Sequence, residues 1–341
     1  MKLAINGLGR IGRNVLRAHY ERAPSAQLQI SALNELADLS ALAHLLRYDS
    51  THGRFPAKIQ SKDGRLQIND DLIPFSQIQN IASLDWQGID LVLECTGVFS
   101  TREAAEIHLQ QGAGRVLFSQ PASADVDATI VYGVNHHSLR PQDRIISGAS
   151  CTTYSSVPVI KCLDEALGIE NGLITTIHSA MNDQPLIDAY HPTDLRLTRS
   201  AFQSFIPVET ALAKGIERIL PKMAGRFEAQ AIRVPTVNVS AIDLTLLVKK
   251  SVSRDSVNQL IREASESFAK DVLAYTEEPL ASCDFNHDPR SAIVDLGQTR
   301  VSGQHLLKVL VWFDNEWAYA NRLLDVAEYI ASLDAKSAEE Q

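Results

Sequence analysis

The chain has 341 residues, 45% of them hydrophobic and 21% charged, which is typical of a folded protein with room for two domains and excludes a largely disordered chain. Its formal net charge of −9 argues against a general binder of nucleic acid or of anionic membranes, although a local basic pocket for a small anion remains open. We therefore expect small-molecule partners.

Cysteine usage and the first residues indicate a reducing compartment. The four cysteines are too few and too scattered for a disulfide framework, and none lies in a CxxC pair of the kind that binds zinc, so we expect no metal. The chain opens with MKLAINGLG, which enters a strand-like run without a basic leader region, and no apolar run approaches the roughly 18 residues of a membrane helix. We expect a cytoplasmic protein.

The first half of the chain alternates short apolar runs with helix-like segments. The predicted strands are LAINGLG, LQISALNE, DLVLECTG, GRVLFSQPA, ATIVYGVN and RIISGAS. Near-continuous apolar strands joined through helices predict a doubly wound parallel sheet with helices on both faces.

The pattern changes close to Cys151. The later runs AQAIRVPTVNVSAIDLTLLVKK and HLLKVLVWFDNEW are longer, rich in β-branched residues and partly alternating. These features are typical of an α+β domain on a mixed, largely antiparallel sheet. We therefore place a domain boundary near residue 150.

A glycine motif, Gly7-x-Gly9-x-x-Gly12, stands where the first strand ends and a helix from Ile11 or Gly12 should begin. Glycines there allow a tight turn, close approach to a pyrophosphate and close helix-to-strand packing, as in the Rossmann fold. The next strand ends near Glu35, which could accept hydrogen bonds from an adenosine ribose and would repel a 2′-phosphate. The motif favours NAD over NADP. The alternative is three turn glycines and a surface glutamate.

Two further strands end in polar residues. Thr96 and Ser119 follow apolar runs, and carboxyl ends of parallel strands are where such folds bind ligands. Both residues are candidate cofactor contacts, and both are equally compatible with ordinary turns. Cys95 is interpreted as a small buried apolar residue.

Cys151 is the candidate nucleophile. It lies among small hydroxyl residues in SGASCTTYSS, at the expected start of a helix, and His178 closes the strand-like run LITTIHS. A helix N-terminus and an imidazolium both stabilise a thiolate, and histidine can move the proton during the chemistry. The sequence leaves His191 and His287 as other candidates.

Two arginines are candidate phosphate ligands because a guanidinium can bond two oxygens at once. Arg199 stands near a loop, and Arg233 stands inside an apolar strand, where an unpaired cation is unfavourable. Either could instead be paired with a carboxylate such as Glu209 or Asp243.

Five segments, in order and across nearly the whole chain, resemble the phosphorylating aldehyde dehydrogenases of the glyceraldehyde-3-phosphate dehydrogenase family. They are INGLGRIGR, the Cys-Thr-Thr segment, TTIHS, RVPT and NEWAYANR. Within the family, HSAMNDQPLIDAYHPTDLR, NELAD, YDSTHGRF, DATIVYGVN and DFNHDPRSAIVD resemble the D-erythrose-4-phosphate dehydrogenase branch most.

The resemblance implies a role for each matching residue. Cys151 matches the nucleophile, His178 the base, and Arg233 an arginine at the substrate phosphate. Asn315 matches the residue that fixes the nicotinamide carboxamide, and Tyr319 a ring near it. The implied cofactor residues are Gly7, Gly9, Arg10, Ile11, Gly12, Glu35, Thr96, Ser119, Asn315 and Tyr319. The implied second anion site is Ser150, Thr152, Arg199 and Thr210.

The resemblance also implies the domains. Residues 1–150 would form an NAD-binding domain completed by a C-terminal helix, 316–341, and residues 151–315 a catalytic domain that makes the contacts of a homotetramer. The implied reaction is NAD-dependent oxidation of D-erythrose 4-phosphate to 4-phosphoerythronate through a cysteine thioester, in pyridoxal phosphate synthesis. The alternatives are a phosphorylating glyceraldehyde-3-phosphate dehydrogenase and a dinucleotide-binding regulator with a decayed active site.

Several positions depart from the family pattern. Where the glyceraldehyde enzymes place two threonines after the histidine to hold phosphate, this chain has Met181 and Asp183. Gly148 replaces a usual asparagine, and Tyr154-Ser155 replaces Asn-Cys. Tyr319, in contrast, is the residue usual in the glyceraldehyde enzymes, whereas the erythrose branch tends to have phenylalanine.

Overall fold

A computed structural model describes residues 1–23 and 25–339, and its internal contacts divide the chain into two compact units. Unit 1 comprises Met1–Ser150 and Tyr319–Gln341, and unit 2 comprises Cys151–Ala318. Residues 340 and 341 of the expected C-terminal helix lie outside the described residues. Within the described part, no helix is long and apolar enough to cross a membrane.

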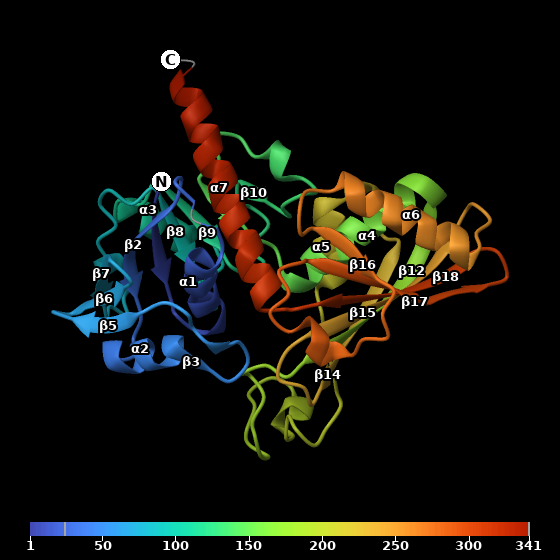
Figure 1. Cartoon of the computed structure of the whole chain (residues 1–341), viewed down its shortest axis with the longest axis horizontal. Coiled ribbons are helices and arrows are strands. Elements are labelled where there is room, and N and C mark those ends of the chain that lie inside the picture. Colours follow the sequence, from blue (N-terminus) through green and yellow to red (C-terminus); the bar gives the residue numbers. More distant parts are fainter. Residues whose placement is uncertain (24, 340–341) are drawn as a thin grey trace. The chain divides into compact units, whose positions relative to one another are not determined.

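Unit 1 is built on one sheet, in which nine strands of the described residues follow the order β10-β11-β9-β8-β1-β2-β7-β6-β5. Every pair from β10 to β7 is parallel, which confirms the predicted parallel sheet, and β7, β6 and β5 add an antiparallel edge (Figure 1). The strands are β1 Lys2–Asn6, β2 Gln29–Asn34, β5 Ile59–Lys62, β6 Arg65–Ile68, β7 Asp71–Ser76, β8 Leu91–Glu94, β9 Arg115–Phe118, β10 Ala128–Thr129 and β11 Ile145–Ser147.

Two details of unit 1 differ from the sequence prediction. The run ATIVYGVN forms only the two-residue strand β10, because residues 131–135 turn back through hydrogen bonds such as Val134 N–H to Val131 O. The edge strands β5 to β7 were not predicted, since they are short and mix polar with apolar residues. A small separate pair is formed by β3 Tyr48–Asp49 and β4 Gly53–Arg54.

The helices of unit 1 follow the strands in the alternation expected of a doubly wound fold. They are α1 Arg10–Glu21, α2 Leu39–Arg47, α3 Arg102–Gln110, the short 3₁₀ helices Ile81–Ser83 and His136–Ser138, and α7 Trp317–Glu339, of which the first two residues belong to unit 2.

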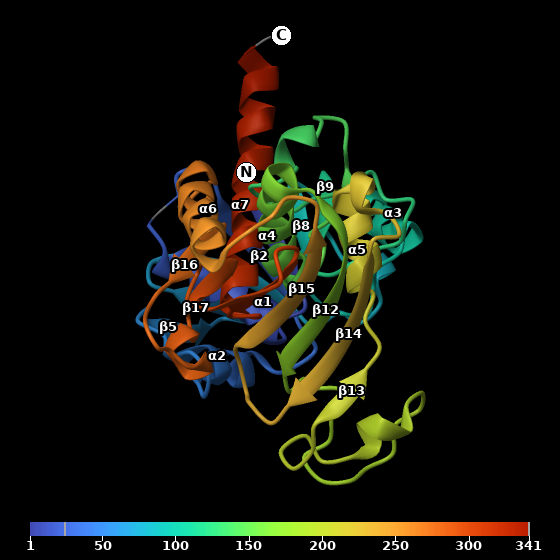
Figure 2. The same ribbon diagram turned by 90° about the vertical axis from the view of Figure 1, so that its right-hand side faces the viewer.

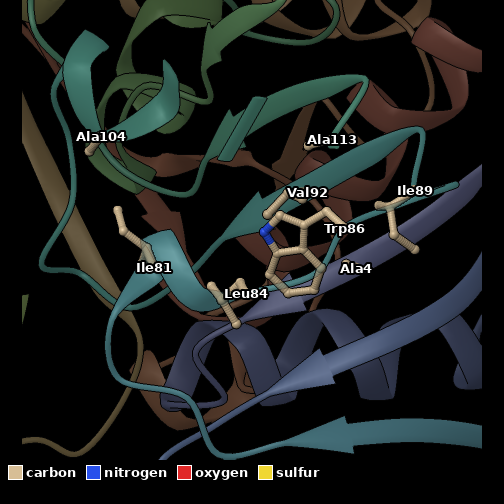
Figure 3. Close-up of a cluster of buried hydrophobic side chains, with 8 residues drawn as sticks. All are labelled: Ala4, Ile81, Leu84, Trp86, Ile89, Val92, Ala104 and Ala113. Atoms are coloured by element: carbon tan, nitrogen blue, oxygen red, sulfur yellow. The ribbon is translucent and has the colours of Figure 1, made fainter. Parts of the chain in front are cut away.

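Trp86 is the centre of one apolar cluster in unit 1 (Figure 3). Its indole N–H donates to Nδ1 of His108 at 2.9 Å, and Nε2 of His108 contacts the carboxylate of Glu94 at 3.1 Å. The cluster comprises Ala4, Ile81, Leu84, Trp86, Ile89, Val92, Ala104 and Ala113. The core of unit 1 is thereby joined to the polar carboxyl end of β8.

Unit 2 carries a second sheet, whose seven described strands follow the order β13-β14-β12-β15-β18-β17-β16. The pairs β14-β12 and β17-β16 are parallel and the others antiparallel, which confirms the predicted mixed sheet. The strands are β12 Ile169–Ser179, β13 Ile206–Val208, β14 Phe227–Val234, β15 Ser240–Val248, β16 Leu273–Thr276, β17 Ala292–Ser302 and β18 Leu306–Phe313.

One face of this sheet is covered by helices that contact one another, while β15, β12 and β14 lie side by side (Figure 2). Along β12 the side chains alternate, so that Ile174, Thr176 and His178 are buried while Leu173 and Ile177 are exposed. The helices are α4 Cys151–Leu167, α5 Leu212–Ile219 and α6 Arg254–Ser267, with 3₁₀ turns Leu195–Thr198, Pro221–Met223 and Ser282–Phe285.

We predict that Trp86→Ala destabilises unit 1 by about 3–5 kcal/mol, because it opens a cavity in the cluster and leaves Nδ1 of His108 without its donor. Hydrogen exchange of the β1 and β8 amides measures this change. Trp86→Phe is the matched variant: it keeps most of the apolar volume and should lose only about 1–3 kcal/mol. Unchanged exchange in Trp86→Ala would contradict the assigned role.

Candidate active site

The glycine turn of unit 1 is fixed by close packing. Gly7 has a φ of +88°, and a Cβ there would lie 2.7 Å from the backbone of Thr96. A Cβ on Gly12 would lie 2.0 Å from the carbonyl oxygen of Gly7. Side chains at these two positions are therefore incompatible with the turn, whereas a Cβ on Gly9 would meet no described atom within 4 Å. The open position of Gly9 fits the close approach of a pyrophosphate.

Helix α1 begins at Arg10, one residue before the predicted start, and no described side chain caps it at Gly9. The guanidinium of Arg10 is bound to the carboxylate of Asp49. Burial would raise the pKa of Asp49, but the hydrogen bonds from Arg10 and from the amides of Thr51 and His52 hold it well below its usual value. The backbone N–H groups of Arg10 and Ile11 lie in the first turn of α1, and an anion is favoured at such a helix N-terminus.

Glu35 ties the end of β2 to the glycine turn. Its carboxylate accepts the amide of Leu8 at 2.6 Å and the amide of Leu36 at 2.7 Å. Oε1 also accepts the amide of Ala37 at 3.3 Å, whereas Oε2, which accepts Leu8, has a further lone pair for a ribose hydroxyl. The negative charge beside the turn fits NAD.

Thr96 and Ser119 lie at neighbouring strand ends, after β8 and β9. The hydroxyl of Thr96 donates to Glu94 and accepts the amide of Val98, so its hydrogen bonds are made within the protein. Ser119 hydrogen-bonds Cys95, whose pKa is raised by burial to about 12. Thr96 therefore shapes the turn against Gly7, and Cys95 is the buried thiol that the sequence predicted.

In unit 2, Cys151 and His178 lie together. Cys151 is the first residue of α4, and its Sγ is 3.9 Å from Nε2 of His178 near the end of β12. Nδ1 of His178 is 2.8 Å from the carbonyl oxygen of Ser179, which accepts only, so Nδ1 carries the proton and Nε2 is the acceptor facing sulfur. The pair has the geometry of a nucleophile and its base.

The other two candidate histidines have different partners. His191 accepts the amide of Asp194 at 3.1 Å, and His287 stacks on Trp317 with ring centroids 3.7 Å apart.

Arg233 lies beside the histidine, because β12 and β14 are parallel and pair His178 with Arg233. Nε and Nη1 of Arg233 are buried without a hydrogen-bond partner among the described residues. Burial lowers the pKa of Arg233, and the carboxylate of Asp183 opposes that shift. Buried donors without an acceptor fit an anionic ligand. Asp243, the carboxylate considered from sequence, pairs instead with Lys308 at 2.6 Å.

Of the four residues of the second predicted anion site, Arg199 and Thr210 interact with groups outside the site. Arg199 is exposed and pairs with Asp188 at 3.1 Å rather than with Glu209. The hydroxyl of Thr210 accepts the amide of Leu212 at 3.3 Å. The two remaining members flank the nucleophile in sequence, namely Ser150 at the end of unit 1 and Thr152 in the first turn of α4.

The two residues expected near the nicotinamide are both held by hydrogen bonds. Oδ1 of Asn315 accepts from the hydroxyls of Ser179 at 3.1 Å and Ser240 at 2.9 Å. The hydroxyl of Tyr319, in unit 1, lies 3.1 Å from the carbonyl oxygens of Gly148 and Ala149.

Tyr319 and Leu323 also account for the glycine at position 148. A Cβ at Gly148 would lie 2.6 Å from a methyl group of Leu323 and 3.3 Å from the Tyr319 hydroxyl. The space of the family's usual asparagine is filled from α7 in this chain.

Sequence reasoning missed Ser179 and Ser240. Serine is common in strands and at turns, and only the pairing of β12 with β15 and of β15 with β18 brings these two hydroxyls to Asn315. The position of Ser179, directly after the candidate base, was the one signal available.

Comparison with known families matches both parts of the chain. The NAD binding domain of glyceraldehyde 3-phosphate dehydrogenase matches residues 1–102, and the C-terminal domain of the same enzyme matches residues 150–315. The chain belongs to the glyceraldehyde 3-phosphate dehydrogenase family. It is an NAD-dependent oxidoreductase of that family, and the glycine turn, the helix start and Glu35 fit the cofactor.

In this structure, burial favours the neutral forms of both Cys151 and His178. Burial raises the pKa of the Cys151 thiol to about 11, although the amide of Thr152 and the charge of Arg233 lower it and part of the residue remains exposed. Burial and the charge of Arg233 lower the pKa of His178 to about 4. Burial thus opposes the resting thiolate expected from the sequence, while the helix N-terminus and Arg233 favour it. A neutral imidazole can take the thiol proton as sulfur attacks.

We predict that alkylation of Cys151 by iodoacetamide, without cofactor, accelerates about tenfold per pH unit from neutrality toward pH 10, because only the thiolate reacts and its pKa is raised. Peptide mass spectrometry separates Cys151 from the exposed Cys283, and Cys151→Ser is the control. A rate that reaches its plateau below pH 7 would show that the resting thiol is ionised.

Proposed function

We propose that this member of the family oxidises D-erythrose 4-phosphate to 4-phosphoerythronate with NAD, through a thioester on Cys151. The observation that carries the substrate choice is Asp183, whose charge acts on both His178 and Arg233. A carboxylate there repels a phosphate seated directly beside the histidine but accepts hydrogen bonds from sugar hydroxyls. A four-carbon sugar places its phosphate one carbon farther from the aldehyde than a triose does.

The proposed chemistry begins with proton transfer within the dyad. Sγ of Cys151 forms a bond to the aldehyde carbon while Nε2 of His178 takes the thiol proton, and the product is a hemithioacetal. The backbone N–H of Cys151 at the start of α4 can stabilise the developing oxyanion, a contribution of about 3 kcal/mol for one such donor. His178 returns the proton to that oxyanion, which completes the neutral hemithioacetal, and the imidazole then serves as the base for the hydroxyl proton when the hemithioacetal is oxidised.

NAD, when bound, supplies the hydride acceptor that turns the hemithioacetal into a thioester. The residues proposed to hold the cofactor are Gly7, Gly9, Arg10, Ile11, Gly12, Glu35, Thr96, Ser119, Asn315 and Tyr319. Of these, Thr96 and Tyr319 act by fixing the turns at residues 96–98 and 148–149, because their hydroxyls are bound there.

Arg233 is the proposed ligand of the substrate phosphate because its Nε and Nη1 are buried without acceptors in the described structure. Ser150, Thr152, Arg199 and Thr210 are the proposed second anion site, in which Arg199 would exchange Asp188 for the incoming anion. Water is the proposed acceptor of the acyl group, and the released carboxylate is 4-phosphoerythronate, a precursor in pyridoxal phosphate synthesis. The four free cysteines agree with a cytoplasmic location.

Tyr319 favours a second candidate, a phosphorylating glyceraldehyde-3-phosphate dehydrogenase, because the glyceraldehyde enzymes usually carry this tyrosine. In that reaction inorganic phosphate, rather than water, cleaves the thioester. The two candidates use the same dyad and differ in substrate length and acyl acceptor.

We predict that NADH forms from D-erythrose 4-phosphate with a kcat/KM at least about tenfold above that for glyceraldehyde 3-phosphate, because Asp183 disfavours the shorter phosphate. The measurement is absorbance at the NADH band, with each aldehyde, with and without inorganic phosphate. Faster, phosphate-dependent turnover of the triose would assign the second candidate. No turnover of either aldehyde would support a decayed, dinucleotide-binding regulator.

Asp183→Thr tests whether the charge of Asp183 sets the preference between the two aldehydes. It removes the charge near His178 and Arg233, so it should raise activity on the triose phosphate relative to the tetrose phosphate. Asp194→Thr is the matched control, since Asp194 accepts the amide of Arg196 in an exposed turn of the same loop.

We also propose a homotetramer, supported by exposed apolar side chains of unit 2. Leu173 and Ile177 stand on the face of β12 opposite the helices, with 63% and 37% of their surface exposed. The segment between β12 and β13 projects beyond the sheet in Figure 2. This segment also exposes several large apolar side chains. These are Leu186, Ile187, Tyr190, Leu195, Phe202 and Phe205. Exposed large apolar side chains in such number are typical of an interface between subunits.

We predict that Leu173→Asp combined with Ile177→Asp shifts the assembly to smaller species at micromolar concentration, because each buries a charge in the proposed interface. Analytical ultracentrifugation measures the change. Leu72→Asp, at an exposed leucine of β7, is the control and should leave the assembly intact. A wild-type monomer, or an unaffected tetramer in the double variant, would contradict the proposed interface.

A further inference from the structure

Three strand ends of unit 2 meet at two buried hydroxyl groups. Ser179 ends β12, Ser240 begins β15, and Asn315 follows β18, and these three strands are neighbours in the sheet. Ser179 is 0% exposed and Ser240 1% exposed, so their hydroxyls interact with protein groups rather than with bulk water. The proposed chemistry gives neither hydroxyl a role.

The hydrogen bonds at this junction fix the direction of each proton. The amide of Ser179 donates to the hydroxyl oxygen of Ser240 at 3.1 Å. The Ser240 hydroxyl is then free to donate its own proton to Oδ1 of Asn315, 2.9 Å away, and the Ser179 hydroxyl donates to the same oxygen at 3.1 Å. Two donors on Oδ1 hold the Asn315 amide in one of its two orientations.

The backbone beside the amide is also fixed. Oδ1 of Asp314 accepts the amides of Glu316 and Trp317 at 2.9 and 2.8 Å, and its Oδ2 accepts the amide of His287 at 2.7 Å. Asn315 itself remains partly exposed, and no described residue accepts a hydrogen bond from its Nδ2. The Asn315 side chain is therefore held in place with the two N–H donors of its Nδ2 directed outward.

We propose that Ser179 and Ser240 are positioning residues that lock the Asn315 amide with its NH₂ group outward, so that the protein recognises a hydrogen-bond acceptor, the carbonyl oxygen of the nicotinamide carboxamide. The proposal rests on the proposed function only in assigning Asn315 to the nicotinamide. It explains why the NH₂ group of Asn315 would bind the oxygen of the nicotinamide carboxamide rather than its nitrogen.

Ser179 has a second duty in this arrangement. Its carbonyl oxygen accepts the Nδ1 proton of His178 at 2.8 Å, while its hydroxyl holds Asn315. One residue thus sets the tautomer of the candidate base and the orientation of the cofactor-binding amide. Mutation to alanine removes the hydroxyl of Ser179 and keeps its carbonyl, so the contact with Asn315 can be tested apart from the contact with His178.

The test compares dissociation constants of NAD and of thionicotinamide adenine dinucleotide, in which sulfur, a poor acceptor, replaces the carboxamide oxygen. Binding is measured by calorimetry without aldehyde. The wild type should bind NAD more tightly than the thio analogue. Ser179→Ala should weaken NAD binding about three- to tenfold, the range of one neutral hydrogen bond, with little effect on the analogue, so the preference declines.

Three further variants make the result specific. Ser240→Thr retains the hydroxyl and should retain the preference, which separates the hydroxyl from the packing of the residue. Asn315→Ala should abolish the preference, and adding Ser179→Ala to it should change nothing further. Ser291→Ala, at a buried serine of unit 2 whose hydroxyl has no partner in the described structure, should behave as wild type.

Two outcomes would overturn the proposal. One is a Ser179→Ala protein with wild-type NAD affinity and wild-type preference. The other is an equal loss from Ser179→Ala with and without Asn315, which would show that the serine acts through general stability. These readouts need no aldehyde, so a wild type that oxidises no sugar phosphate but shows the predicted binding would remove the proposed function and keep this inference.

Discussion

The proposed chemistry of this protein depends on one hydrogen bond, from Nδ1 of His178 to the carbonyl oxygen of Ser179. A neutral imidazole carries a single proton, and this bond places it on the side away from Cys151. Nε2 is consequently an acceptor at 3.9 Å from sulfur. If the proton were on Nε2, the two groups would face each other as donors and the thiol would have no base.

Burial sets the charge state of the pair. The strand alternation that turns His178 toward the helix-covered face also removes it from water, and Arg233 lies next to it in the parallel register. Both effects disfavour an imidazolium and lower the pKa of His178, whereas burial raises the pKa of the Cys151 thiol against the opposing effect of Arg233. These shifts suit the proposed transfer of the thiol proton to His178 during attack. An anion bound at Arg233 would reduce the positive field and make His178 a stronger base.

Both units bury hydrogen-bonded polar side chains at the ends of strands. In unit 1, the buried carboxylate of Glu94 gathers Asn6, Thr96 and His108 at the carboxyl edge of the parallel sheet, which fixes the turn around Gly7. In unit 2, Ser179, Ser240 and Asn315 meet at the ends of β12, β15 and β18. In both cases polar side chains are buried with their partners, which makes the local geometry rigid.

Much of this was determined by the sequence alone. Local spacing is enough to predict the glycine turn, the parallel sheet, the start of a helix at Cys151 and the candidate base, because each follows from neighbours within a few residues or from a recurring apolar period. The family was visible for the same reason, since its motifs are short and contiguous.

Only the tertiary structure decided which groups of distant segments meet and how buried they are. The register of β12 against β14 and β15 selected Arg233, Ser179 and Ser240 as neighbours of the site. Asp243 of β15 pairs with Lys308 of the adjacent strand β18, and Arg199 pairs with Asp188 within the segment between β12 and β13. Packing from α7 explained the glycine at position 148. Register and burial are properties of strand pairs and layers, so no single stretch of sequence specifies them, and the pKa values that govern the dyad depend on both.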